Sequence, residues 1–142
     1  IIWLFAVVWG TDVMAYFGGR LIGGPKLWTR VSAGKTWSGT LVGVASGAAL
    51  GLGVAVVRND AQVALLPMFF VGLVAAAVAQ AGDLLESAVK RRFDVKDSSN
   101  LIPGHGGVMD RLDGFITSAA LAAAIGAARA WPAVAEGLFQ WR

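Results

Sequence analysis

The chain has 142 residues, of which 56% are hydrophobic and 15% charged, and its formal net charge is +3. Soluble domains carry roughly a quarter charged residues, and long stretches here have none, so a soluble globular protein is excluded and lipid is the expected solvent. The absence of cysteine excludes disulfides and thiolate metal sites, and the cations form no solvated stripe of the kind that binds nucleic acid.

Four apolar segments follow one another along the chain, and each predicts a membrane helix. They are Ile1 to about Gly18, Gly39–Val57, Ala61–Gly82 and Gly114–Ala128. Backbone polar groups in lipid must be bonded internally, and the alternation of barrel strands is absent, so the segments are expected to be helical. The expected fold is all-α: a polytopic transmembrane helix bundle of about four helices, forming one domain over residues 1–142. Because the chain opens inside an apolar segment without an initiator Met, we expect it to be the C-terminal part of a longer protein.

The second segment carries a regular row of glycines, at Gly39, Gly43, Gly47 and Gly51. Residues four apart share one side of a helix, and small residues at this spacing let two helix backbones approach closely. The row therefore predicts a helix-packing surface rather than a functional site.

The fourth segment is too short to cross a bilayer alone. Its 15 residues rise about 22 Å at 1.5 Å per residue, whereas the hydrocarbon core is about 30 Å thick. A full crossing must include the preceding turn, which contains Asp110 and Asp113. We therefore expect two carboxylates at or just below the membrane surface.

The cations predict two polar loops on the same side of the membrane. The loop after the first segment carries Arg20, Lys26, Arg30 and Lys35, and the loop before the fourth carries Lys90, Arg91, Arg92 and Lys96. The turn between the second and third segments has only Arg58. The positive-inside rule then places both rich loops in the cytoplasm.

Two pairs of carboxylates flank the second of these loops, and they are candidate metal ligands. Asp83 and Glu86 are three apart, as are Asp110 and Asp113, so each pair shares a helix face. Hard oxygen ligands of this kind suit Mg²⁺, which binds a few carboxylates together with water and substrate phosphate. The alternative for the first pair is ion pairing with Lys90, and for the second a helix N-terminal charge. Acids near membrane depth are costly, which favours the metal site.

Two glycine-containing segments are candidate phosphate-binding elements. Residues 103–107, Pro-Gly-His-Gly-Gly, directly precede the fourth helix, where backbone N–H groups can converge on an anion. Residues 32–37 contain Gly-Lys-Thr but lack the glycine spacing and preceding strand of a Walker loop. His105, the only histidine, could be a loop hydrogen-bonder, a phosphate donor or a proton carrier. Asp12 could pair with Arg20 or Arg30, or support the metal site.

Together these residues resemble a known family. The run Ser87-x-x-Lys90-Arg91-x4-Lys96-Asp97-x-Ser99-x2-Ile102-Pro103-x-His105-Gly106-Gly107-x-x-Asp110-Arg111-x-Asp113 is similar to the signature of the phosphatidate cytidylyltransferases, integral membrane CDP-diacylglycerol synthases. The segments Asp12-x-x-Ala15-Tyr16-x-x-Gly19-Arg20, Ser32-x-x-Lys35-Thr36-Trp37 and Gly82-Asp83-Leu84-x-Glu86-Ser87 extend the resemblance in the family's order. It covers residues 10 to about 120.

The resemblance implies an enzyme that transfers CMP from CTP to phosphatidate, giving CDP-diacylglycerol and pyrophosphate. It implies catalytic roles for Asp83, Lys90, His105, Asp110 and Asp113, of which Asp83, Asp110 and Asp113 would hold one or two Mg²⁺ ions, with a second kind of cation also open. Substrate-binding roles are implied for Arg20, Ser32, Lys35, Thr36, Ser87, Arg91, Lys96, Asp97, Gly106 and Gly107. The site would face the cytoplasm from a bacterial-type inner membrane, in contact with membrane lipid, and a homodimer is left open.

Two other functions are weighed against this one. An ion- or proton-coupled transporter also uses intramembrane carboxylates, but its acids should lie near mid-span, whereas all of these except Asp12 lie near the predicted cytoplasmic edge. A CDP-alcohol phosphotransferase uses metal-bound aspartates as well, but the longer aspartate spacing of that family is absent.

Overall fold

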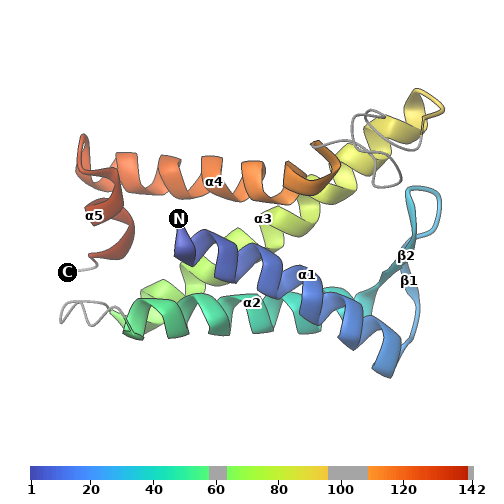
Figure 1. Cartoon of the computed structure of the whole chain (residues 1–142), viewed down its shortest axis with the longest axis horizontal. Coiled ribbons are helices and arrows are strands. Elements are labelled where there is room, and N and C mark those ends of the chain that lie inside the picture. Colours follow the sequence, from blue (N-terminus) through green and yellow to red (C-terminus); the bar gives the residue numbers. More distant parts are fainter. Residues whose placement is uncertain (58–63, 96–108, 141–142) are drawn as a thin grey trace.

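The structure is a bundle of helices with one short β-hairpin at its end (Figure 1). This computed structural model describes residues 1–57, 64–95 and 109–140, without the side chains of residues 109–111. The elements are, in chain order, α1 (Ile2–Ile22), β1 (Lys26–Trp28), β2 (Ser32–Thr36), α2 (Trp37–Val57), α3 (Leu65–Arg92), α4 (Met109–Ala130) and α5 (Val134–Phe139).

Four of the helices are long and apolar enough to cross a membrane, which confirms the predicted polytopic bundle. They are α1, α2, α3 and the part of α4 from Leu112 to Ala130. Each packs on the next one along the chain. Large apolar side chains such as Leu66, which is 68% exposed, point outward from the bundle. This is the surface that a lipid solvent favours.

The third helix is longer than the sequence predicted. The apolar run ends at Gly82 and the acid pair Asp83 and Glu86 was expected at the end of the helix, but α3 continues to Arg92 and has 28 residues. This is about 42 Å at 1.5 Å per residue, which exceeds the ~30 Å of a bilayer core. The charged end continues the helix because Glu86 and Lys90 form an i,i+4 ion pair of 3.5 Å. The prediction that Lys90, Arg91 and Arg92 lie in a loop is therefore wrong: they form the last turn of α3.

The fourth helix begins where the length argument requires. It starts at Met109, so Asp110 and Asp113 both belong to its first turns. The inclusion of this charged turn in the helix is confirmed.

The first helix runs four residues past its predicted end, to Ile22, which places Arg20 in its last turn.

The predicted glycine surface of α2 packs against α1. All four glycines of the row are buried. A Cβ built on Gly43 would lie 2.6 Å from the carbonyl oxygen of Thr11, and one on Gly39 would lie 2.6 Å from that of Ala15. Only glycine permits this close approach of two backbones, so the packing role is confirmed.

The β-hairpin was not predicted, and it replaces part of the first polar loop. Strands β1 and β2 are antiparallel, with Lys26 opposite Thr36 and Trp28 opposite Ser32. The amide of Val31 donates to the carbonyl of Trp28 over 3.2 Å and closes the turn. Lys35 therefore belongs to strand β2, where the sequence predicted a loop.

The apolar core lies at the end of the bundle away from the hairpin. Its buried side chains include Trp3, Val7, Met68 and Leu138, and the ring of Phe139 in α5 meets Trp3 edge-on at 5.9 Å. In Figure 1, α5 and the start of α1 lie far from the hairpin. The polar residues of the membrane helices therefore gather at the opposite end.

Candidate active site

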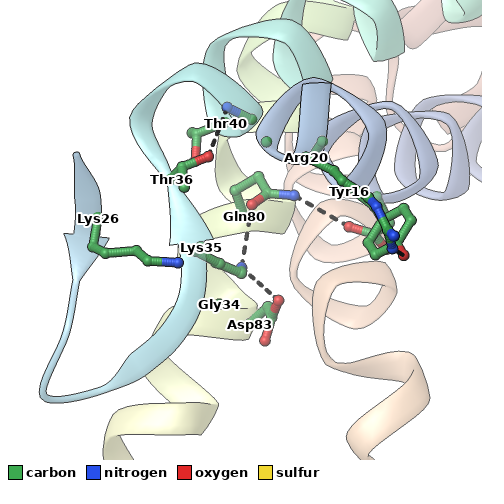
Figure 2. A pocket seen from close by; sticks show the side chains of 13 residues that line it. Tyr16, Arg20, Lys26, Gly34, Lys35, Thr36, Thr40, Gln80 and Asp83 are labelled. Carbon is green, nitrogen blue, oxygen red and sulfur yellow. Dashed lines mark hydrogen bonds and ion pairs between the residues drawn. The ribbon is translucent and has the colours of Figure 1, made fainter. Parts of the chain in front are cut away.

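A cavity of about 600 Å³ lies at the hairpin end of the bundle (Figure 2). Its lining residues come from α1, the hairpin, α3 and the start of α2. They are Asp12, Ala15, Tyr16, Gly19, Arg20, Lys26, Gly34, Lys35, Thr36, Gly39, Thr40, Gln80 and Asp83. Apolar helices thus enclose a cavity in which carboxylates and cations face one another.

A continuous polar chain crosses the cavity. The ammonium of Lys35 lies 2.5 Å from Oδ2 of Asp83 and donates to Oε1 of Gln80 over 3.2 Å. At its other end, the Gln80 amide donates through Nε2 to Oδ1 of Asp12 over 3.2 Å. Residues from α1, β2 and α3 are therefore joined in one network, in which a single cation is shared by an acid and an amide.

Contacts of Thr36 and Ser38, at the junction of β2 and α2, join the hairpin to the ends of α1 and α2. The amide of Gly39 donates to Oγ1 of Thr36 over 3.1 Å, so Thr36 caps the N-terminus of α2. Ser38 contacts Oγ1 of Thr36 and donates to the carbonyl of Gly23. A Cβ on Gly19 would lie 2.8 Å from that same Thr36 hydroxyl. These contacts determine where β2 leaves the bundle and where Lys35 points.

A second pair of close contacts brings Asp113 toward the same end. Gly82 of α3 packs on Thr117 of α4, and a Cβ on Gly114 would lie 3.1 Å from the carbonyl oxygen of Ala79. Asp113 therefore follows α3 at the level of Asp83. Its Oδ1 accepts a hydrogen bond from the amide of Gly114 over 2.6 Å. Asp83, Asp113 and Lys35 are all close enough to Asp12 to act on it electrostatically.

The rim of the cavity near the end of α1 is cationic. Arg20 donates from Nη1 to the hydroxyl of Tyr16 over 2.9 Å, and Lys26 faces the cavity from β1. The sequence left open an ion pair between Asp12 and Arg20. In the structure Arg20 contacts Tyr16 instead, and Asp12 contacts Gln80. These cations are placed to meet an anionic group at the mouth of the cavity.

The structure brings some of the predicted site residues together and not others. Arg20, Lys35, Thr36 and Asp83 line the cavity. Ser87 lies one turn beyond Asp83 and donates to it over 3.5 Å. Ser32 and Arg91 do not line the cavity, and Lys90 pairs with Glu86, as the alternative interpretation of that acid had it. Lys96, Asp97, His105, Gly106, Gly107 and the side chain of Asp110 lie outside the described residues.

Gln80 is a cavity residue that the sequence analysis missed. It is 4% exposed and bridges Asp12 and Lys35. The signal was present, since Gln80 interrupts the apolar run close to Gly82 and lies three residues before Asp83, on the same helix face. Buried amides in apolar helices require partners, so Gln80 could have been predicted as a site residue beside Asp83.

The predicted metal ligands come from the facing ends of α3 and α4. Among the described residues, no group of three His, Cys, Asp or Glu side chains is close enough to hold an ion. Two of the three predicted ligands, Asp83 and Asp113, are at one end of adjacent helices, and the third is Asp110. Their carboxylate oxygens are the type of ligand that a hard divalent cation prefers.

The fold and the cavity define a class: an integral membrane protein of several helices with a polar site enclosed at one end of the bundle. The family follows from the sequence, because residues 1–128 match the Cytidylyltransferase family. The chain belongs to that family.

Curated relatives carry one enzyme name. The chain is 50% identical to a phosphatidate cytidylyltransferase of Brucella abortus over 98% of its own length and 51% of the relative's. It is 43% identical to one of Bacillus subtilis over 78% of its length and 40% of that protein's. The chain therefore spans about half the length of the curated relatives it matches.

A solved structure supports the fold. It is described as an intramembrane enzyme for archaeal membrane lipid biosynthesis. The match covers 97% of this chain and 79% of the solved chain, with a TM-score of 0.58 and 22% sequence identity. At that identity the likeness concerns the arrangement of the helices.

Proposed function

We propose that the protein transfers CMP from CTP to phosphatidate, forming CDP-diacylglycerol and pyrophosphate. Membership of the family and the shared name of its relatives support this proposal. The structural observation that carries it is the cavity at the end of the membrane helices, where Lys35 and Asp83 face the same space. Nothing in the comparisons supports the transporter alternative.

The reaction demands alignment and charge neutralisation more than acid or base chemistry. A phosphate oxygen of phosphatidate would attack the α-phosphorus of CTP. A new P–O bond forms, the bond from this phosphorus to the oxygen bridging to the β-phosphate breaks, and pyrophosphate leaves with that oxygen. The nucleophile is already an anionic oxygen, so no protein nucleophile is needed.

The chain's own charges suit these steps. Lys35 would bind a phosphate oxygen within the cavity, and Arg20 and Lys26 would hold an anionic headgroup or pyrophosphate at its mouth. Thr36 keeps β2 in place as the cap of α2. From the sequence we add Lys90, Arg91 and Lys96 as partners for the triphosphate, together with Ser32, Ser87, Asp97, His105, Gly106 and Gly107 as further substrate contacts.

Mg²⁺ is the cofactor we propose. Asp83 and Asp113 would hold it, with Asp110 as the third ligand expected from the sequence. When bound, the ion would neutralise phosphate charge and stabilise the leaving oxygen. Lys35 would then exchange its contact with Asp83 for one with phosphate.

A direct assay tests this function. The full-length protein in detergent or liposomes is incubated with labelled CTP, phosphatidate and Mg²⁺, and the lipid phase is examined for a CDP-containing product. We expect label in the lipid phase that depends on all three additions. Ion flux through liposomes without that product would overturn the proposal.

Replacing Lys35 with alanine should slow the reaction by about tenfold, the value of one charge-assisted hydrogen bond. The effect should be smaller than that of losing Asp83, because the lysine supplies one contact whereas the carboxylate holds the ion on which several contacts depend. Turnover at saturating substrate gives the ranking, and Lys35→Arg serves as the control that keeps the charge. A Lys35→Ala enzyme slower than Asp83→Asn would reverse it.

The orientation of the bundle is also a proposal, and the absence of cysteine makes it easy to test. The hairpin and the end of α3, which are both rich in cations, and a site that uses CTP should face the cytoplasm. Ala33 in β2 and Val95 after α3 are exposed at one end of the bundle, and Ala133 before α5 is exposed at the other (Figure 1). Single cysteines at positions 33 and 95 should resist an impermeant thiol reagent added outside intact cells, and one at position 133 should react. Labelling of positions 33 and 95 from opposite sides would contradict a common site.

A further inference from the structure

The feature that the reaction does not by itself explain is the buried amide of Gln80. It is 4% exposed and lies on α3 one turn before Asp83. A polar side chain in an apolar helix is costly unless both ends of its amide are hydrogen-bonded. Both ends are: Oε1 accepts from Lys35 and Nε2 donates to Asp12, each over 3.2 Å (Figure 2).

The amide of Gln80 matches the chemistry of its two partners. An ammonium only donates hydrogen bonds and a carboxylate only accepts them. Glutamine supplies an acceptor to Lys35 and a donor to Asp12 without adding charge. A glutamate would place a second carboxylate against Asp12, and an apolar side chain would take one hydrogen-bond partner from Asp12 and one from Lys35.

Gln80 also provides Lys35 with a second anchor. Lysine has a long flexible stem, and ordering it costs side-chain entropy. In the structure, the ammonium contacts both Asp83 and Gln80. If Asp83 turns to a divalent cation, the neutral amide can still hold the ammonium inside the cavity.

We propose that Gln80 is a positioning residue that holds the Lys35 ammonium in the cavity, ready for a phosphate group of the nucleotide or the lipid. This deepens the proposed function and rests on it only for the identity of the ligand. The hold of Gln80 on Lys35 is a property of the protein itself, so it can be measured without turnover.

The first test measures the chemical reactivity of Lys35. The full-length protein is treated with an amine-reactive ester, and the modification of each lysine is followed by mass spectrometry. In Gln80→Met the rate for Lys35 should rise severalfold, while Lys26 on the neighbouring strand serves as an internal reference. An unchanged Lys35 rate would overturn the proposal.

Two further variants separate positioning from packing. Ser118→Ala removes a buried hydrogen bond of 2.7 Å from α4 to the carbonyl of Ala75 on α3, and it should leave the Lys35 rate unchanged. Gln80→Glu keeps an acceptor for Lys35, so the rate should be no faster than in wild type. If Gln80→Met fails to fold, Gln80→Glu tests the proposal in its place. Faster modification of Lys35 in Gln80→Glu than in wild type would contradict the positioning role of Gln80.

The second test is a double-mutant cycle on kcat/KM for CTP. Gln80→Met should lower this value by about tenfold in the wild-type background and hardly at all in Lys35→Ala, because residues that act through one another are not additive. Equal losses in both backgrounds would show an independent structural role and overturn the proposal. Full-length protein that lacks cytidylyl transfer but retains the reactivity pattern would refute the proposed function and leave the positioning role standing.

Discussion

Replacing Asp83 with asparagine is expected to lower cytidylyl transfer at least about 100-fold, as loss of a metal ligand and of its charge commonly does. The variant keeps the shape of the side chain and should still insert into the membrane. It loses the carboxylate that lies 2.5 Å from the Lys35 ammonium and that we propose as a ligand for Mg²⁺. Both the ion and the lysine therefore lose a partner in one substitution.

The measurement is turnover at saturating CTP and phosphatidate over a range of Mg²⁺ concentrations, with thermal unfolding as a check on folding. Asp94→Asn is a matched control, because it removes the same charge just beyond the end of the same helix. Asp94 is exposed and has a φ of 54°, a conformation that asparagine accepts well. It should stay within about twofold of wild type, as surface changes usually do. Near-normal turnover and Mg²⁺ dependence in Asp83→Asn would remove this residue from the site.

Replacing Gly43 with alanine is expected to destabilise the protein by about 1–3 kcal/mol, the usual cost of overpacking. The added Cβ would lie 2.6 Å from the carbonyl oxygen of Thr11 and 2.7 Å from the Cβ of Ala15. Because the first of these atoms belongs to the backbone of α1, a side-chain rotation cannot relieve the clash. The two helices must separate, and the hairpin they carry must move with them.

Gly53 on the same helix provides the matched control. A Cβ there meets nothing within 4 Å, so Gly53→Ala should be neutral or slightly stabilising, since alanine favours the helix over glycine. Unfolding of the purified protein in detergent, followed by circular dichroism, compares the two variants. Similar unfolding temperatures for Gly43→Ala and Gly53→Ala would mean that α1 and α2 do not pack through the glycine row.

The helices were predictable because their cause is local. Runs of apolar residues without charges are stable in lipid as helices. The glycine row from Gly39 to Gly51 predicts close packing against another helix, without specifying which one. The shortness of the last apolar run also predicted that Asp110 and Asp113 belong to its helix, as they do. The end of α3 was misplaced because hydropathy marks where lipid contact stops, whereas a charged helix can continue beyond it.

By itself the sequence determined the class of the protein, the membrane helices and the glycine surface, and it supplied the residue types of the proposed phosphate- and metal-binding site, since all of these depend on composition and on spacing within one element. Only the tertiary structure decided which of those residues share a cavity. Lys35 and Asp83 are 48 positions apart, and they meet because a hairpin bends β2 over α3. Gln80 has a clear role only once Asp12 and Lys35 are seen on either side of it. Such contacts depend on how separate helices pack, and the packing depends on the shapes of surfaces that no single segment contains.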